Sequence, residues 1–336
     1  MALFPPRPSF HTGNSLLLID TADEAMMESH SRPLTPWKLR SRVLEMGRRT
    51  LVMGIVNVTP DSFSDGGLFL DPQTAVARAT QLLDEGADLL DLGAESTRPG
   101  SRAGGEAKTP FAPAVDAEEE QARLLPVIEG ILRERPQAIL SIDTYKAATA
   151  RAACQAGAEI VNDVSGFCWD PEMAAACAAA GCGVVLMHTR GRPEEWSAQA
   201  QLPPQELLAA VRSGLEASLE LAAAQGMAAE SIVLDPGYGF GKRYDENYAL
   251  LVRQRDLLAL GRPLLVGLSR KSFLGRTLAP LHNGVDAAAA DRESASLAAL
   301  VAAILHGAAI VRVHAVRPAV EAARVADAVL AGATSV

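Results

Sequence analysis

Residues 138–163 read AILSIDTYKAATARAACQAGAEIVND and contain one complete copy of the unit that decides the fold. A short apolar run ends at Asp143, an alanine-rich helical stretch follows, and a second apolar run ends at Asp163. Continuous apolar runs are typical of parallel strands that are buried on both faces. Gly157 stands just before the second run, where a left-handed glycine ends a helix at little steric cost. The stretch predicts a strand, a helix and a parallel strand.

The same unit recurs about eight times from Thr50 onward, at intervals of roughly 25 to 45 residues. Glycines at 86, 181 and 307 repeat the helix-ending pattern of Gly157. The predicted strands are Leu51–Asn57, Asp88–Gly93, Ala138–Asp143, Glu159–Asp163, Gly183–His188, Ile232–Asp235, Leu264–Gly267 and Ile310–His314. Eight strands that alternate with helices predict an α/β protein of the (β/α)8 TIM barrel type, with a doubly wound open sheet as the alternative.

Composition sets limits on the class of protein. The chain has 336 residues, of which 49% are hydrophobic and 21% are charged, and this suits one barrel domain. We expect residues 1–35 to form a poorly ordered N-terminal extension and residues 36–335 to form the barrel. The net charge of -9 argues against a nucleic-acid partner. Neither a membrane span nor a signal peptide is evident, so we expect a cytoplasmic protein without a membrane partner.

A polar residue follows each predicted strand, at or just past its carboxyl end. The residues are Asn57, Glu95, Asp143, Asn162 with Asp163, His188, Asp235, Ser269 with Lys271, and Arg312 with His314. Any one of them is most simply explained as a helix cap or turn residue. In a barrel, however, the carboxyl ends of all strands converge on one face, where such enzymes place their active sites. The recurrence after every strand therefore predicts an active site at that face.

Several of the loops on this face suggest specific chemistry. Asp235 can accept two parallel hydrogen bonds from an amino-pyrimidine edge, and Phe240 offers an aromatic face beside it. Arg312 and His314 lie two residues apart on one strand, so both side chains point to the same face and predict an anion site. The loop over residues 58–70 suits a lid, although its composition alone favours an ordinary surface loop. No serine elbow or histidine metal cluster is evident.

These segments resemble the signatures of the dihydropteroate synthase family. The resemblance covers about residues 36–330 and is most specific at GIVNVTPDSFSDGG (residues 54–67), at SRKS (269–272) and at RVH (312–314). It implies a barrel, usually a homodimer, that condenses 6-hydroxymethyl-7,8-dihydropterin pyrophosphate with 4-aminobenzoate. The implied products are 7,8-dihydropteroate and pyrophosphate, and the implied cofactor is Mg²⁺.

The resemblance also implies a role for individual residues. The implied pterin site is Asp143, Asn162, Met187, Asp235 and Lys271. The implied pyrophosphate site is Asn57, Arg312 and His314, with Asn57 at the metal. The implied 4-aminobenzoate site is Phe63, Thr97, Arg98, Pro99, Phe240 and Ser272. The implied catalytic residues are Asp61, Lys271, Arg312 and His314.

The sequence departs from the family pattern in three places. The second loop is longer than usual over residues 103–113, Thr189 stands where the family often has a larger apolar residue, and the extension 1–35 has no counterpart. Two alternatives stay open. A pterin-binding methyltransferase that uses methyltetrahydrofolate would share Asp143, Asn162 and Asp235, and a catalytically silent paralogue would keep the pocket but lose lid or anion residues.

Overall fold

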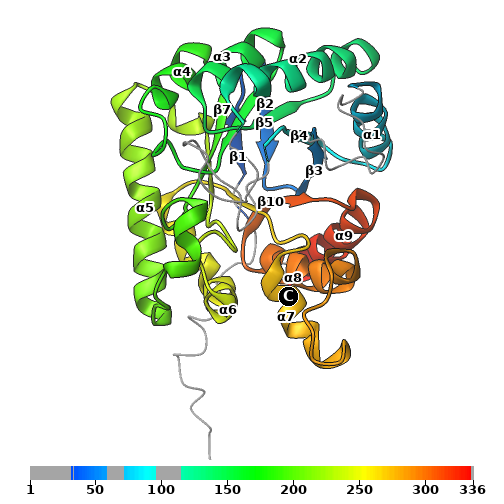
Figure 1. The fold of residues 1–336 in the computed structure, drawn as a ribbon, viewed down its shortest axis with the longest axis vertical. Helices are drawn as coiled ribbons and strands as arrows, with labels where there is room; N and C mark the ends of the chain where they lie inside the picture. Colours follow the sequence, from blue (N-terminus) through cyan, green and yellow to red (C-terminus); the bar gives the residue numbers. More distant parts are fainter. Residues whose placement is uncertain (1–31, 33, 59–71, 96–114, 334–336) are drawn as a thin grey trace, which may run out of the picture.

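The computed structural model describes residues 32, 34–58, 72–95 and 115–333. Eight parallel strands close into a barrel in the order β10-β3-β4-β5-β6-β7-β8-β9, and helices surround it (Figure 1). The barrel strands are β3 (Leu51–Asn57), β4 (Leu89–Gly93), β5 (Leu140–Asp143), β6 (Ile160–Asp163), β7 (Gly183–Met187), β8 (Ile232–Asp235), β9 (Leu264–Val266) and β10 (Ala308–Val313). The predicted (β/α)8 barrel is confirmed, and the open sheet is excluded.

The helices cover the outer face of the barrel. The α-helices are α1 (Pro72–Asp84), α2 (Ala117–Glu134), α3 (Ala147–Ala156), α4 (Met173–Ala180), α5 (Pro204–Ala224), α6 (Tyr244–Arg253), α7 (Ser272–Leu278), α8 (Glu293–Leu305) and α9 (Val316–Ala333). Short 3-10 helices are η3 (Pro193–Ala198), η4 (Ala229–Ser231), η5 (Gln254–Leu260), η6 (Ala279–Leu281) and η7 (Ala289–Arg292). Gly157 and Gly181 end α3 and α4 in the left-handed conformation, as predicted. No helix in the described part of the chain is both long and apolar enough to cross a membrane.

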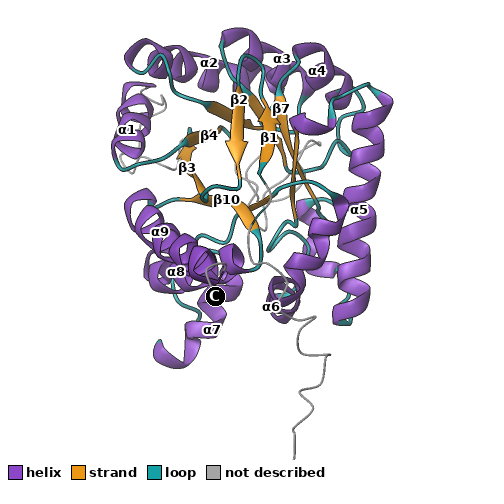
Figure 2. Ribbon diagram, turned by 180° about the vertical axis from the view of Figure 1, so that it is seen from behind, coloured by secondary structure: helices purple, strands orange, loops and turns teal. Residues whose placement is uncertain are grey.

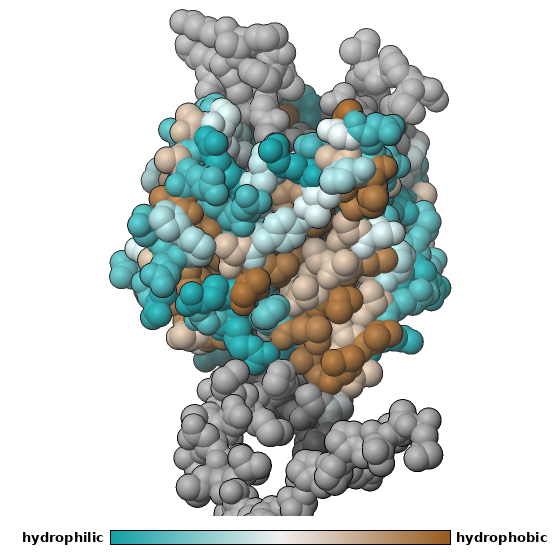
Figure 3. Space-filling view, turned by 90° about the horizontal axis from the view of Figure 1, so that it is seen from below, coloured by the Kyte–Doolittle hydropathy of each residue, from teal (hydrophilic) through white to brown (hydrophobic). Residues whose placement is uncertain are grey.

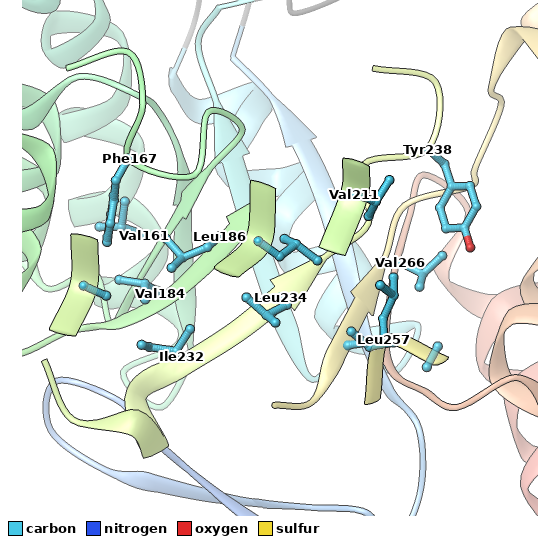
Figure 4. Packing of buried hydrophobic residues seen from close by; sticks show 14 of the residues in the cluster. Val161, Phe167, Val184, Leu186, Val211, Ile232, Leu234, Tyr238, Leu257 and Val266 are labelled. Atoms are coloured by element: carbon cyan, nitrogen blue, oxygen red, sulfur yellow. The ribbon is translucent and has the colours of Figure 1, made fainter. Parts of the chain in front are cut away.

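Apolar side chains pack on both sides of the strand ring. Outward-facing residues such as Val161, Val184 and Leu234 pack against the helices (Figure 4). Strand side chains alternate, so their neighbours point into the barrel. The inner layer near the amino ends is apolar and includes Met53, Leu89, Ile160, Val185, Val233, Leu265 and Ile310.

A two-stranded hairpin, β1 (Thr35–Lys38) and β2 (Val43–Met46), covers the amino-terminal end of the barrel (Figure 2). Trp37 is fully buried, packs in the same cluster as the inner layer, and donates its indole N–H to the Ser231 carbonyl oxygen at 3.1 Å. Just before the hairpin, Arg32 forms an ion pair with Asp327 of α9. The sequence analysis did not predict this hairpin, because each strand has four residues and lies outside the repeated unit.

Candidate active site

At the carboxyl end of the barrel, a second layer of inward-pointing side chains follows the inner apolar layer. Asp91, Asn162, Met187, Asp235 and Arg312 each follow an inner-layer residue by two positions on the same strand. Because side chains alternate along a strand, these five also point into the barrel. The parallel register places Asp143 beside Asn162 and Met187 beside Asp235. The structure thus brings the predicted pterin residues together at one mouth.

Asp91 lies at the centre of a charged group inside this mouth. One carboxylate oxygen accepts the Ser141 hydroxyl at 2.6 Å, and the other accepts the Asn162 amide at 3.0 Å and Arg312 Nε at 2.5 Å. Arg312 Nη2 donates to Asp143 Oδ2 at 2.6 Å. Asp91 is completely buried, and a buried carboxylate requires such partners. The Arg312 guanidinium therefore bridges two carboxylates.

Burial shifts the protonation of this group. Desolvation raises the pKa of Asp143 to about 7, although the neighbouring Arg312 opposes the shift. Burial works to lower the pKa of Arg312, but Asp91 and Asp143 outweigh it and raise that pKa further. Arg312 is therefore a permanent cation, whereas Asp143 titrates near neutrality.

Asp235, at the end of β8, and Lys271, in the loop after β9, lie at the same mouth. Asp235 accepts the Gly237 backbone N–H at 2.7 Å, and burial raises its pKa. Burial lowers the pKa of Lys271 to about 8, and its ammonium lies 3.9 Å from the centre of the Phe240 ring. The pKa values of both groups are thus shifted toward neutral pH, as is common at functional sites.

An apolar surface lies beside these charged groups. Met187 packs with Tyr145 and Val164, and Trp169 and Phe240 pack against these three. The combination of a flat apolar surface with carboxylate, amide and ammonium groups is suited to a planar heterocycle that carries several hydrogen-bond donors and acceptors.

A buried lysine holds the turn after β8 in place. Lys242 donates to the carbonyl oxygens of Gly237 at 2.8 Å, His188 at 3.2 Å and Phe240 at 3.3 Å. Gly237 has a φ of 70°, and a Cβ there would lie 1.9 Å from the His188 carbonyl oxygen. Lys242 and the glycine at position 237 therefore fix the conformation of the turn that follows Asp235 and carries Phe240.

Asn57, His314 and Ser272 occupy the rim. The Asn57 side chain is exposed at the end of β3. His314 Nδ1 lies 3.0 Å from the Ser269 hydroxyl, and α7 begins at Ser272. Asp61, Phe63, Thr97, Arg98 and Pro99, together with the longer loop at 103–113, lie outside the described residues.

Comparison with known proteins identifies the family. A model of the family described as "Pterin binding enzyme" matches residues 53–314. The dihydropteroate synthase of Mycobacterium leprae is 44% identical over 280 residues, which cover 82% of this chain and 92% of that protein. The chain belongs to the dihydropteroate synthase family. It is accordingly an enzyme of that kind, a transferase that forms dihydropteroate.

Solved structures of dihydropteroate synthases share the whole fold. The Xanthomonas albilineans enzyme with 4-aminobenzoic acid is 38% identical, has a TM-score of 0.76, and covers 89% of this chain and 99% of its own. The same enzyme in complex with 7,8-dihydropteroate is 36% identical, has a TM-score of 0.73, and covers 88% and 99%. These likenesses extend over the barrel and its mouth, so they favour a dihydropteroate synthase over the methyltransferase alternative.

Two residues of the site in this member of the dihydropteroate synthase family were not predicted from the sequence. Asp91 was not proposed as a site residue, although a charge inside the apolar run Leu89-Leu-Asp91-Leu was a usable signal. Lys242 was not proposed as a site residue either, because nothing in a sequence shows that its ammonium binds three carbonyl groups.

Proposed function

We propose that this chain condenses 6-hydroxymethyl-7,8-dihydropterin pyrophosphate with 4-aminobenzoate, giving 7,8-dihydropteroate and pyrophosphate. One observation carries the proposal: Asp143, Asn162, Asp235 and Lys271 surround the apolar surface of Met187 at the mouth of a barrel of this family. Each element of a pterin ring finds a complementary group in that set.

The pterin ring is recognised by its edges and its face. Asp235 accepts hydrogen bonds from the two parallel N–H groups of the amino-pyrimidine edge. Lys271 donates hydrogen bonds to the side of the ring that carries the carbonyl oxygen and a ring nitrogen. Asp143 and Asn162 read the opposite edge, while Met187 packs on the ring face. Asp91 acts through these residues, because it orients the Asn162 amide and holds Arg312 in place.

The pyrophosphate end comprises Asn57, Arg312 and His314. Arg312 supplies a fixed positive charge for the leaving group and also limits the repulsion between Asp91 and Asp143. It therefore has to bind two sets of anions when substrate is bound, and 21% of its side chain is exposed.

Magnesium fits this end as an ion held largely by the substrate. Among the described residues no cluster of three His, Cys, Asp or Glu side chains forms a cation site. Asn57 offers one exposed amide oxygen, and Mg²⁺ is commonly bound by one or two protein oxygens with phosphate oxygens and water. When bound, Mg²⁺ neutralises negative charge on the departing pyrophosphate.

The reaction needs no covalent bond to the enzyme. The bond between the methylene carbon and the pyrophosphate oxygen breaks, and the electron pair leaves with pyrophosphate. The dihydropterin delocalises the positive charge of the methylene carbon, the arylamine nitrogen attacks that carbon, and the amine then loses one proton. Positional isotope exchange in bound substrate without aminobenzoate tests this order, and complete absence of exchange would contradict it.

The arylamine side combines Phe240 and Ser272 with the first and second loops. Phe240 offers a ring face at the mouth, and Ser272 begins α7 next to Lys271. Phe63, Thr97, Arg98 and Pro99 complete this side in the proposal, and Asp61 of the first loop is proposed as catalytic.

The direct test follows pyrophosphate and dihydropteroate together. Purified protein is given dihydropterin pyrophosphate and Mg²⁺, with and without 4-aminobenzoate. Formation of both products only with aminobenzoate supports the proposal. Tight pterin binding without dihydropteroate would overturn it, and a methyl-transfer assay would then distinguish the methyltransferase from a silent paralogue. An Asp235→Asn variant is the matched control, because it keeps shape but removes one paired acceptor oxygen.

The active form is proposed to be a homodimer in the cytoplasm. Large apolar side chains are exposed on α6 and around η6, namely Tyr244, Val252, Leu281 and Val285. Apolar side chains also gather on the face shown in Figure 3. Such clustering is typical of interaction surfaces. Light scattering after size-exclusion chromatography measures the state directly, and a monomer mass at micromolar concentration would contradict a stable dimer.

A further inference from the structure

The loop between β7 and α5 carries a tryptophan that packs behind the arylamine side of the mouth. Trp196 lies in η3, is 7% exposed, and meets the Phe240 ring at a centroid distance of 5.1 Å and an interplanar angle of 86°. This is the edge-to-face arrangement that aromatic pairs prefer. The contact joins two segments that are more than forty residues apart in the sequence.

Two hydrogen bonds hold Trp196 in this orientation. Its indole N–H lies 3.2 Å from the Thr189 hydroxyl and 3.2 Å from the Gly191 carbonyl oxygen. The Thr189 hydroxyl in turn donates to that same carbonyl at 3.0 Å. Thr189 is one of the positions at which the sequence was expected to depart from the family pattern, and its hydroxyl is one of the two acceptors of the indole N–H.

Two lysines also contact Phe240. The Lys271 ammonium lies 3.9 Å from the centre of its ring, and Lys242 binds its carbonyl oxygen. The neighbouring Gly241 has a φ of 67°, and a Cβ there would lie 3.1 Å from Trp196 Cδ1. The turn and η3 are therefore in close contact, and Phe240 has little freedom to tilt.

We propose that Trp196 is a positioning residue that fixes the Phe240 ring and thereby sets the affinity of the enzyme for its arylamine substrate. The inference depends on the proposed function, because it assumes that Phe240 contacts the arylamine. Trp196 acts through Phe240, which also packs against the Met187 cluster and lies under the Lys271 ammonium. The printed side-chain hydrogen bonds of Asp143 and Asn162, in contrast, go to Arg312 and Asp91. We therefore expect the larger effect on the arylamine substrate.

The test uses three substitutions that remove different parts of the contact. Trp196→Leu removes the ring and both hydrogen bonds, Trp196→Phe keeps a ring edge but loses the hydrogen bonds, and Thr189→Val removes one acceptor at nearly constant shape. An edge-to-face pair contributes enough to change an affinity about three- to tenfold. We expect Trp196→Leu to raise the KM for 4-aminobenzoate by that factor. Trp196→Phe and Thr189→Val should raise it by less.

Two other quantities separate positioning from a general loss of structure. The KM for dihydropterin pyrophosphate and kcat should stay within about twofold of the unsubstituted enzyme in all three variants. Trp37→Leu is the matched control, since it removes a buried tryptophan from the far end of the barrel and should leave both KM values unchanged. If Trp196→Leu fails to fold, Trp196→Phe and Thr189→Val still decide, and an unchanged KM for aminobenzoate in both would overturn the proposal.

Phe240→Ala distinguishes failure of this inference from failure of the proposed function. A raised aminobenzoate KM in Phe240→Ala together with an unchanged one in folded Trp196→Leu overturns only the role of Trp196. An unchanged KM in Phe240→Ala removes Phe240 from the arylamine site, and the inference is overturned with it. Equal rises for both substrates in Trp196→Leu would also overturn it, because they indicate general loosening of the mouth.

Discussion

The two ends of the barrel are built from the same strands but are stabilised in opposite ways. At the amino end, Trp37 of the hairpin closes an apolar layer that includes Leu89 and Ile310. Two residues further along the same strands, Asp91 and Arg312 form a buried ion pair at the carboxyl end. Apolar burial stabilises the fold directly, whereas buried charges need all of their partners to avoid a net destabilisation.

The carboxyl end of the barrel is therefore the end at which burial of charged groups lowers the stability of the fold. The pKa of Asp143 is raised by burial, and the pKa values of Lys242 and Lys271 are lowered by burial, so each charge is held in an unfavourable environment. Trp37 and its neighbours carry no such penalty. Barrel enzymes in general separate a stabilising face from a catalytic face. Substitutions at the two ends of this barrel should therefore affect stability and activity separately.

Arg312→Ala should have the largest effect on activity. It removes the fixed cation proposed for the leaving group and leaves Asp91 and Asp143 facing each other. We expect kcat/KM to fall by about 10²- to 10³-fold. Circular dichroism should show a folded protein whose free energy of unfolding is lower by about 3 kcal/mol. Near-normal turnover would refute the anion site, and Arg312→Lys is the matched control that keeps the charge but loses the bridging geometry.

Trp37→Ala should show the reverse behaviour at the other end. The side chain is fully buried and makes one hydrogen bond to Ser231, so its removal should lower the free energy of unfolding by about 3–5 kcal/mol. Chemical denaturation measures the loss. We expect kcat/KM at moderate temperature to stay within about twofold, and a large loss of activity in the folded variant would show that the two ends are not independent.

The pH dependence of kcat/KM should report the buried charges of the mouth. Below about pH 7 Asp143 takes up a proton and no longer accepts a hydrogen bond from the pterin. Above about pH 8 Lys271 loses its proton and its charge. The two ionisations predict a narrow bell-shaped pH profile of kcat/KM with its maximum between these two pH values. On each side of the maximum, kcat/KM should fall about tenfold per pH unit. In Lys271→Arg the alkaline limb should disappear, because a guanidinium keeps its proton; a limb that persists would assign it to another group.

The fold was predictable from the sequence because its signal is repeated. The eight strand ranges agree with the structure to within two residues at each end, since an apolar run and a helix recur around the whole barrel and a glycine ends several of the helices. The β1–β2 hairpin occurs once and is short, so no periodicity revealed it. Trp37 reaches its position through a contact with Ser231, far along the chain, and such contacts leave no local pattern.

The site was predictable in its location and in its residue types, but its pairing was not. The polar residues Asp143, Asn162 and Asp235 do meet at one mouth. Arg312 and His314 were predicted to form an anion site together, and this stays a prediction. The sequence did not show that the Arg312 guanidinium bridges Asp91 and Asp143. Which partner a charged side chain selects depends on side-chain conformation across three strands, and sequence spacing does not determine it.

Arg49→Ala should have the smallest effect and provides a matched contrast to Arg312→Ala. Both arginines bind a carboxylate of the β4 region, but Arg49 pairs with Asp88 at the amino end, where 59% of its side chain is exposed. Water screens that pair, so we expect a loss of less than about 1 kcal/mol in the free energy of unfolding and no change in kcat/KM. Asp88 also accepts the Val52 backbone N–H at 2.9 Å and keeps that bond in the variant. Suppose instead that Arg49→Ala lowered the free energy of unfolding as much as Arg312→Ala does. Burial would then not explain why the ion pairs of the mouth matter more for stability than the exposed Arg49–Asp88 pair. The difference between the two ends of the barrel would have to come from local geometry alone.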